Sequence, residues 1–215
     1  MSASSKSTHR RAAAWKFLVL MILASSLAAC TLLPGAEPAR TFILPVGAQA
    51  PSSNAPLDAT LQVATPRANA ILKNRRILVM PSSNELSVYK GARWSTDVPV
   101  LLRDRLIEAF RQSGRLTGVF AGSAPVRSDF MLLSELDAFH SEYQADTPWV
   151  VIRLDAQLIE GASRRLLANR YFTVRIKSEG TRIESVVDAF GRAADELSEQ
   201  LLDWGLANIA DHVES

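Results

Sequence analysis

Apolar and polar residues alternate through the middle of the chain, and this alternation predicts long β-strands. Between Val150 and Leu158 every second residue is apolar, and the residues between them include Arg153, Asp155 and Gln157. Residues 166–177 repeat this period of two, and residues 130–143 form a further apolar stretch of strand length. A sheet with one apolar and one polar face packs its helices on the apolar face.

Shorter apolar runs earlier in the chain predict further strands. They lie at 41–44, around Leu61 and Val63, and at 76–80. The last run is followed by a turn at 81–84 and by Leu86–Tyr89, which we expect to pair back as a hairpin. Residues 45–58 contain three prolines and are predicted to form a loop, and residues 67–74 a connection.

Two segments carry apolar residues at helical spacing. The first runs from Val98 to Ser113, with Asp97 placed to cap its start, Pro99 in its first turn and Gly114 at its end. The second runs from about Arg182 to Ile209. We therefore predict a single α+β domain, in which a mostly antiparallel twisted sheet has two main helices packed on one face.

The first 29 residues have the organisation of a lipoprotein signal peptide. A basic region ending at Lys16 precedes an apolar stretch, 17–29, which is shorter than the roughly 20 residues that span a hydrocarbon core. Leu27-Ala28-Ala29-Cys30 resembles a lipobox, the signal at which bacterial lipoproteins are cleaved and acylated on cysteine. We expect an acylated Cys30 and tether over 30–40, the domain over 41–210, and a tail over 211–215.

The residue that follows the cysteine indicates the membrane. Thr31 stands where an aspartate commonly retains lipoproteins at the inner membrane of enterobacteria. We therefore expect an anchor in the outer membrane, with the domain facing the periplasm. Acyl chains on Cys30 replace a transmembrane helix in this arrangement.

Composition and charge exclude several classes of function. The chain of 215 residues carries a net charge of +2, but the signal peptide holds four basic residues and no acid, so the mature chain has 20 basic and 22 acidic residues and a charge of −2. A weakly acidic protein has no general electrostatic reason to bind nucleic acid. The single cysteine excludes an internal disulfide and a cysteine-rich metal site.

The sequence contains little that could support catalysis or a bound metal. His140 is the only histidine inside the predicted domain, and one histidine does not make a typical zinc site. Glu135 and Asp137 have the spacing of a carboxylate pair on one strand face, although solvated charge is the simpler interpretation. Because hydrolase, phosphate-loop and dinucleotide motifs are absent, we expect no enzyme and no cofactor apart from the lipid on Cys30.

The order of features from the hairpin onward resembles a known family. The stretch Leu86–Trp94, with Tyr89 followed by Ala92-Arg93-Trp94 and then by a helix, is similar to the ABC-type transport auxiliary lipoproteins, which include the paraquat-inducible C-type lipoproteins. The likeness covers about residues 40–210. It departs from the family after Trp94, where only the second proline, Pro99, of a Pro-Leu-Pro-like element is kept.

The resemblance implies a function and a partner. It implies a non-enzymatic outer-membrane lipoprotein that docks the periplasmic MCE-domain protein of an ABC system for lipid or phospholipid transport. Two other classes stay open: a lipoprotein that binds a lipid or another hydrophobic ligand between sheet and helices, and an envelope assembly or secretion lipoprotein.

Aromatic and cationic residues at two places are candidates for contacts with a partner. Tyr89, Arg93 and Trp94 form a candidate partner-binding group, since Trp, Tyr and Arg concentrate interface energy, although an aromatic at a strand-to-helix junction more often plugs the core. The second predicted helix would be about 42 Å long, more than a small sheet covers. Trp204 and Ile209 near its end are therefore candidates for a contact with a second subunit in a homo-oligomer.

Overall fold

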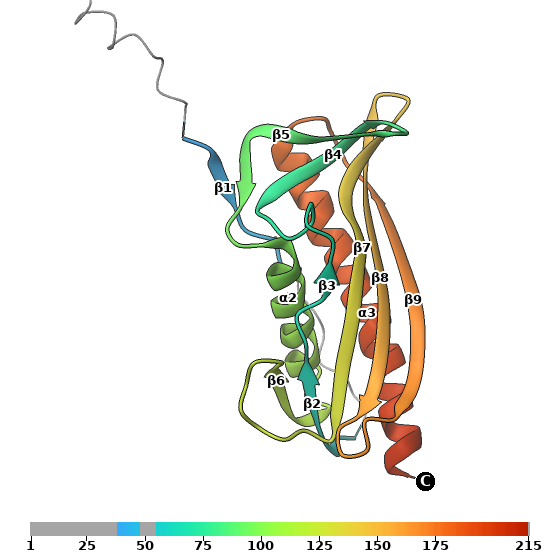
Figure 1. The fold of residues 1–215 in the computed structure, drawn as a ribbon. Helices are drawn as coiled ribbons and strands as arrows, with labels where there is room; N and C mark the ends of the chain where they lie inside the picture. The colour runs from blue at the N-terminus through green and yellow to red at the C-terminus, as the bar shows by residue number, and fades with distance from the viewer. Residues whose placement is uncertain (1–37, 48–54, 215) are drawn as a thin grey trace, which may run out of the picture. The chain divides into compact units, whose positions relative to one another are not determined.

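Three long antiparallel strands form the body of the sheet. The computed structural model describes residues 38–47 and 55–214, and Figure 1 shows their arrangement. Strands β7 (Phe130–Gln144), β8 (Thr147–Glu160) and β9 (Leu166–Lys177) follow one another as hairpin partners. The alternation seen in the sequence places Val150, Ile152 and Leu154 in the core at 0% exposure, as expected. The predicted signal peptide and the predicted acylation site, Cys30, lie outside the described residues.

The other edge of β7 pairs with three short strands placed end to end. In order along β7 these are β2 (Leu57–Val63), β3 (Arg67–Ala68) and β4 (Arg76–Ser82), and all three are parallel to it. β6 (Leu116–Ala121) extends the sheet beside β2. β5 (Glu85–Trp94) pairs antiparallel with β4, and β1 (Arg40–Phe42) pairs parallel with β5.

The α+β prediction is confirmed, and the sheet is a mixed one. Antiparallel pairing holds the long hairpins, while the parallel pairings within the described residues are short. A 15-residue strand is long enough to accept several short partners along one edge, which explains the mixture. β6 and the two-residue β3 were not predicted, because neither has a run of alternating apolar residues long enough to be recognised.

Both helices pack on the same face of the sheet. α2 (Val98–Gln112) begins after Asp97, which has extended backbone but makes no side-chain capping hydrogen bond. Gly114, just beyond the end of α2, has φ +63°, a conformation that glycine adopts without strain. α3 (Ile183–Val213) continues past Ile209, so the predicted tail at 211–215 is mostly helical and that prediction is wrong.

The last turn of α3 is held by tertiary contacts. The His212 ring meets Phe130 edge-on at 5.7 Å between centroids, and its Nε2 lies 3.2 Å from the Glu160 carboxylate. These contacts extend the helix beyond its apolar stripe. Within the described residues, neither helix combines the length and the apolarity that crossing a membrane requires.

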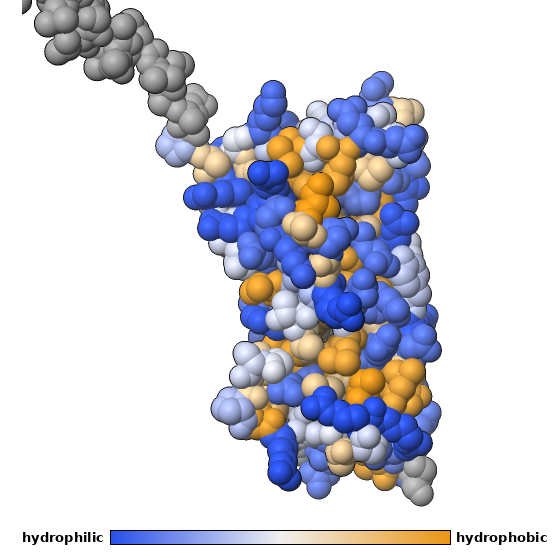
Figure 2. Space-filling view, viewed as in Figure 1, coloured by the Kyte–Doolittle hydropathy of each residue, from blue (hydrophilic) through white to orange (hydrophobic). Residues whose placement is uncertain are grey.

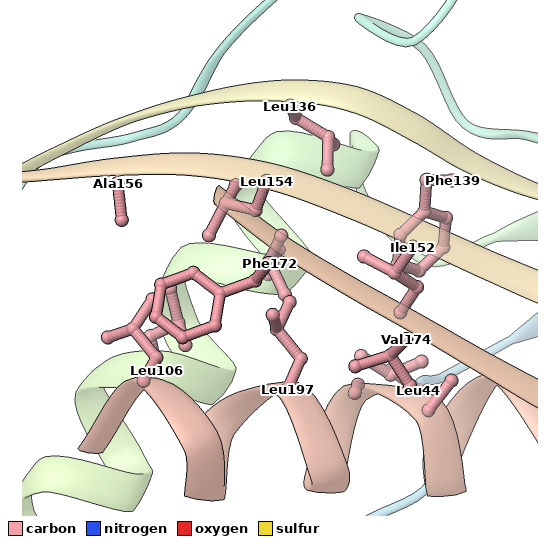
Figure 3. Close-up of a cluster of buried hydrophobic side chains, with 14 of the residues drawn as sticks. Leu44, Leu106, Leu136, Phe139, Ile152, Leu154, Ala156, Phe172, Val174 and Leu197 are labelled. Carbon is pink, nitrogen blue, oxygen red and sulfur yellow. The ribbon is translucent and has the colours of Figure 1, made fainter. Parts of the chain in front are cut away.

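Side chains fill the space between the sheet and the helices. Figure 3 shows residues from the strands and the helices meeting in one cluster, with Phe172 of β9 near Leu197 of α3 and Leu154 of β8. At the other end of this cluster, the rings of Phe139 and Phe190 stack at 4.8 Å. The core is therefore continuous along the length of α3.

Candidate functional site

Trp94, the last residue of β5, is part of the hydrophobic core. Its side chain is 0% exposed, and its ring meets Phe139 and Phe190 edge-on at 6.0 and 5.3 Å between centroids. The indole Nε1 is buried and has no hydrogen-bond partner among the described residues. The interpretation of Trp94 as a partner-facing anchor is wrong. It is the plug at the strand-to-helix junction, which was the alternative.

Tyr89 lies at the margin of the same core. It is half-buried, and its hydroxyl lies 3.0 Å from Oγ of Ser141 on β7. Burial raises the pKa of Tyr89 to about 12, so the phenol stays protonated at any physiological pH. The side chain therefore ties β5 to β7 across β4.

Arg93 points away from Trp94, as the alternation along the strand predicted. It is exposed, and its Nε donates to Oγ1 of Thr41 at 3.2 Å. In the strand register Arg93 lies opposite both Thr41 of β1 and Arg76 of β4. The structure thus does not join Tyr89, Arg93 and Trp94 into one surface, because the arginine lies on the sheet face opposite the tryptophan.

The end of α3 is covered by the domain itself. Ile209 is 0% exposed, so the interpretation of this residue as a contact with a second subunit is wrong. Trp204 is partly buried, and its ring meets Phe172 of β9 at 5.8 Å. The 31 residues of α3 span about 46 Å at 1.5 Å per residue, and the 14 residues of β8 span about 46 Å at 3.3 Å per residue, so the hairpins match the helix in length.

A groove on the helix-free face of the sheet was not predicted from the sequence. It has a volume of about 290 Å³ and lies between the β3–β4 connection, the β4–β5 hairpin and β7. Its apolar lining includes Ile71 and Leu86, which are 42% and 41% exposed. Figure 2 shows apolar side chains gathered in this part of the molecule, beside β4 and β5. The apolar lining comprises Ile71, Leu72, Leu78, Met80 and Leu86.

The polar end of this groove contains a histidine with an unmet hydrogen bond. His140 is 7% exposed, and its buried Nε2 faces the Glu142 carboxylate at 3.9 Å, too far for a hydrogen bond. Burial lowers the pKa of His140 below its ordinary value, so the imidazole is neutral near pH 7. Asp137 and Arg153 stand beside it in the lining. The only sequence signal for this site was a lone histidine on a strand.

The candidate carboxylate pair does not gather into a catalytic arrangement. Glu135 and Asp137 are both exposed on β7, and Asp137 is a bulged residue between the paired Leu136 and Ala138. Both side chains therefore fit the simpler interpretation of solvated charge. Across the described part of the chain, no three His, Cys, Asp or Glu side chains are grouped so that they could hold a metal ion.

A larger, more polar cleft of about 850 Å³ lies at the opposite end of the domain, where the β6–β7 connection, the β8–β9 turn and the end of α3 meet. Its charges are of both signs. Asp129 accepts hydrogen bonds from the hydroxyl and the amide of Thr60 at 2.6 and 2.9 Å, and these bonds lower its pKa. Glu160 is paired with His212. The acids of this cleft are thus partly satisfied within the protein itself.

The fold of this chain is similar to that of bacterial proteins whose structures have been solved. Protein XCC0632 of Xanthomonas campestris has a TM-score of 0.77 and 31% sequence identity, and the match covers 82% of this chain and 100% of that one. The hypothetical protein CT253 of Chlamydia trachomatis shares the fold alone, with a TM-score of 0.51 and 5% identity over 71% of this chain and 98% of that chain.

The family is shown by sequence. The chain belongs to the family of ABC-type transport auxiliary lipoprotein components, whose model matches residues 42–201. The description of this family names lipoproteins that serve as auxiliary components of ABC-type transport. A protein of Bradyrhizobium diazoefficiens described as uncharacterized is 24% identical over 148 residues, which cover 69% of this chain and 40% of that longer relative.

Proposed function

We propose that this protein is an outer-membrane lipoprotein that docks the periplasmic MCE-domain protein of an ABC lipid-transport system and catalyses no reaction itself. The family match over residues 42–201 supports a role as an auxiliary transport component. The lipobox at 27–30 supports the anchor, and Thr31 supports the outer membrane. The docking role depends on the groove beside His140.

The groove carries the proposal because it combines two features of a binding surface. Ile71 and Leu86 keep around two fifths of their surface in water, although they adjoin the buried Leu78. A partner side chain that covered them would gain about 25 cal/mol for each Å² of apolar surface buried. At its polar end, the exposed side chains of Asp137 and Arg153 offer polar contacts that fix the orientation of the partner.

The filled core favours docking over the carriage of a lipid by this domain. A protein that held a lipid between sheet and helices would need an apolar cavity there. Instead, Phe172, Leu154 and Leu197 pack against one another in that space (Figure 3). The lipid-binding alternative would therefore require the core to open.

The docking surface is tested with one charged substitution and a matched control. We expect Leu86→Glu to weaken co-purification of the acylated protein with its MCE-domain partner at least tenfold, because it places a carboxylate in the apolar wall of the groove. Leu166→Glu changes a leucine that is 51% exposed at the start of β9, outside the groove, and should leave the interaction intact. Equal retention of the partner by both variants would refute docking at the groove.

The anchor is tested separately. Mass spectrometry of the protein from the native envelope should show acyl chains on Cys30, and Cys30→Ser should release the domain into the soluble fraction. An unmodified thiol on a soluble wild-type chain would refute the anchor without bearing on the groove.

A further inference from the structure

Five exposed cations gather around the strands at the start of the domain. Lys73 and Arg75 come from the β3–β4 connection, Arg76 begins β4, and Lys90 and Arg93 lie in β5, the strand that pairs with β1. We call these five residues the basic edge. Figure 2 shows hydrophilic side chains crowding the surface around β1 and β5. Because the mature chain as a whole carries a charge of −2, this concentration is local.

Acidic residues do not neutralise the basic edge. Arg40 of β1 is paired with Glu184 at 2.7 Å. Among the described residues, no carboxylate comes within ion-pair distance of any member of the basic edge. Arg75 donates from Nε to the backbone carbonyl of Trp94 at 3.2 Å, and Arg93 donates to Thr41, so these two contacts fix side-chain positions without removing charge.

Two of these arginines lie directly opposite each other. Arg76 and Arg93 are register partners in the antiparallel β4–β5 pair. Like charges at opposed positions destabilise a sheet, so this arrangement costs free energy unless an anion lies between or above them. Guanidinium groups have the planar, multiple donors that bind phosphate, so two arginines at opposed positions favour an anion at this place.

An exposed apolar side chain lies next to this pair. Ile43 is 72% exposed and follows Thr41 by two residues, and Thr41 is the register partner of Arg93. Val46, three residues further on, is 62% exposed. Basic side chains bordered by exposed aliphatic ones are typical of surfaces that lie in the interface of a bilayer.

The tether limits how far this surface can be from a membrane. Cys30 and Arg40 are separated by ten residues, which reach at most about 35 Å when fully extended. If Cys30 is acylated as proposed above, the start of β1 is held within that distance of the bilayer. We propose that the basic edge, with Ile43 beside it, contacts the anionic phosphate groups of the bilayer surface and so orients the anchored domain. This inference rests on the proposed acylation of Cys30.

Charge substitutions on the unacylated chain measure the contact apart from the anchor. The mature chain with Cys30→Ser should bind vesicles of phosphatidylglycerol and phosphatidylcholine, and should bind phosphatidylcholine alone far more weakly. Each basic residue near an anionic surface raises the partition coefficient of a protein onto the membrane roughly fivefold. Arg76→Gln with Arg93→Gln should therefore lower vesicle binding about 10- to 30-fold.

A matched pair of substitutions controls for net charge. Arg127→Gln with Arg170→Gln removes the same two charges from exposed positions outside the basic edge, and should lower binding less than threefold. An equal loss with both pairs would refute a contact made by this edge. Binding that was equal on neutral and anionic vesicles would refute attraction of the basic edge to a bilayer surface with net negative charge.

A fluorescent label on the acylated protein separates failure of this inference from failure of the anchor. Because Cys30 is the only cysteine and acylation blocks it, Ile43→Cys supplies one free thiol for an environment-sensitive dye. We expect a blue shift at position 43 on anionic vesicles, and none for Leu166→Cys. A protein that floats with vesicles while the label at position 43 stays in water would overturn the contact and leave the anchor intact. A wild-type protein that does not float would overturn the anchor instead.

Discussion

Arg105 and Asp195 form an ion pair between the two helices that allows a sharp test of the packing. The Arg105 side chain of α2 is 2% exposed, and its Nη2 donates to Oδ1 of Asp195 on α3, which is 25% exposed. Nε and Nη1 of Arg105 are buried and have no hydrogen-bond partner among the described residues. The second oxygen of Asp195 accepts a hydrogen bond from the Gly47 amide at 2.9 Å, so this carboxylate ties together α2, α3 and the segment after β1.

Removing either partner should have unequal effects. Asp195→Ala leaves a buried guanidinium without its counter-charge, and breaking buried pairs in this way costs 3–5 kcal/mol. Because the carboxylate is a quarter exposed, we expect the low end, about 3 kcal/mol. Arg105→Met keeps most of the volume and removes both the charge and the two unpartnered N–H groups, while the partly exposed Asp195 keeps water and its hydrogen bond from Gly47, so the cost should stay within about 1 kcal/mol.

Urea unfolding followed by far-UV circular dichroism measures both effects. The Asp195→Ala midpoint should fall with an unchanged m-value, and its Tm should fall by about 6–12 °C at 2–4 °C for each kcal/mol. Asp203→Ala, an exposed aspartate on the same helix, is the matched control and should change stability by less than about 0.5 kcal/mol. If Arg105→Met lost as much stability as Asp195→Ala, the reasoning from unequal burial would be refuted.

Three further predictions concern single positions. Trp94→Ala should lower the free energy of unfolding by about 3–5 kcal/mol, and Trp94→Phe by clearly less, because a phenyl ring leaves a smaller cavity while both changes remove the unpartnered N–H; equal losses in urea would contradict this. Burial holds the pKa of His140 below its ordinary 6.5, so this side chain binds a proton more readily in the unfolded chain than in the folded one. The free energy of unfolding should therefore fall as pH drops through 6.5, and in His140→Gln, measured by unfolding at several pH values, this fall should be smaller. Gly114→Ala should cost about 1 kcal/mol in thermal unfolding, because φ is +63° and no neighbouring atom lies within 4 Å of the added Cβ to offset the strain.

Patterns of neighbouring residues determined most of the secondary structure. The period of two over 150–158 and the helical stripes over 98–113 and 182–209 each depend only on residues a few positions apart, so they could be read from the chain. The alternation along the strand also predicted that Arg93 and Trp94 lie on opposite faces. It did not predict which of the two side chains faces the core. Only the tertiary packing made that choice, by placing Phe139 of β7 and Phe190 of α3 around Trp94.

Contacts between distant segments decided the surfaces. Ile209 is buried because α3 and the β7–β9 hairpins have matching lengths. One edge of β7 pairs in parallel with three short strands and not with one long strand. The groove at His140 exists because the β3–β4 connection folds beside the β4–β5 hairpin, and Arg76 meets Arg93 only through strand register. By itself, the sequence determined the long strands, the two helices and the fold class. The tertiary structure decided which side chains are exposed together, because that depends on packing between segments far apart in the chain and no local pattern records it.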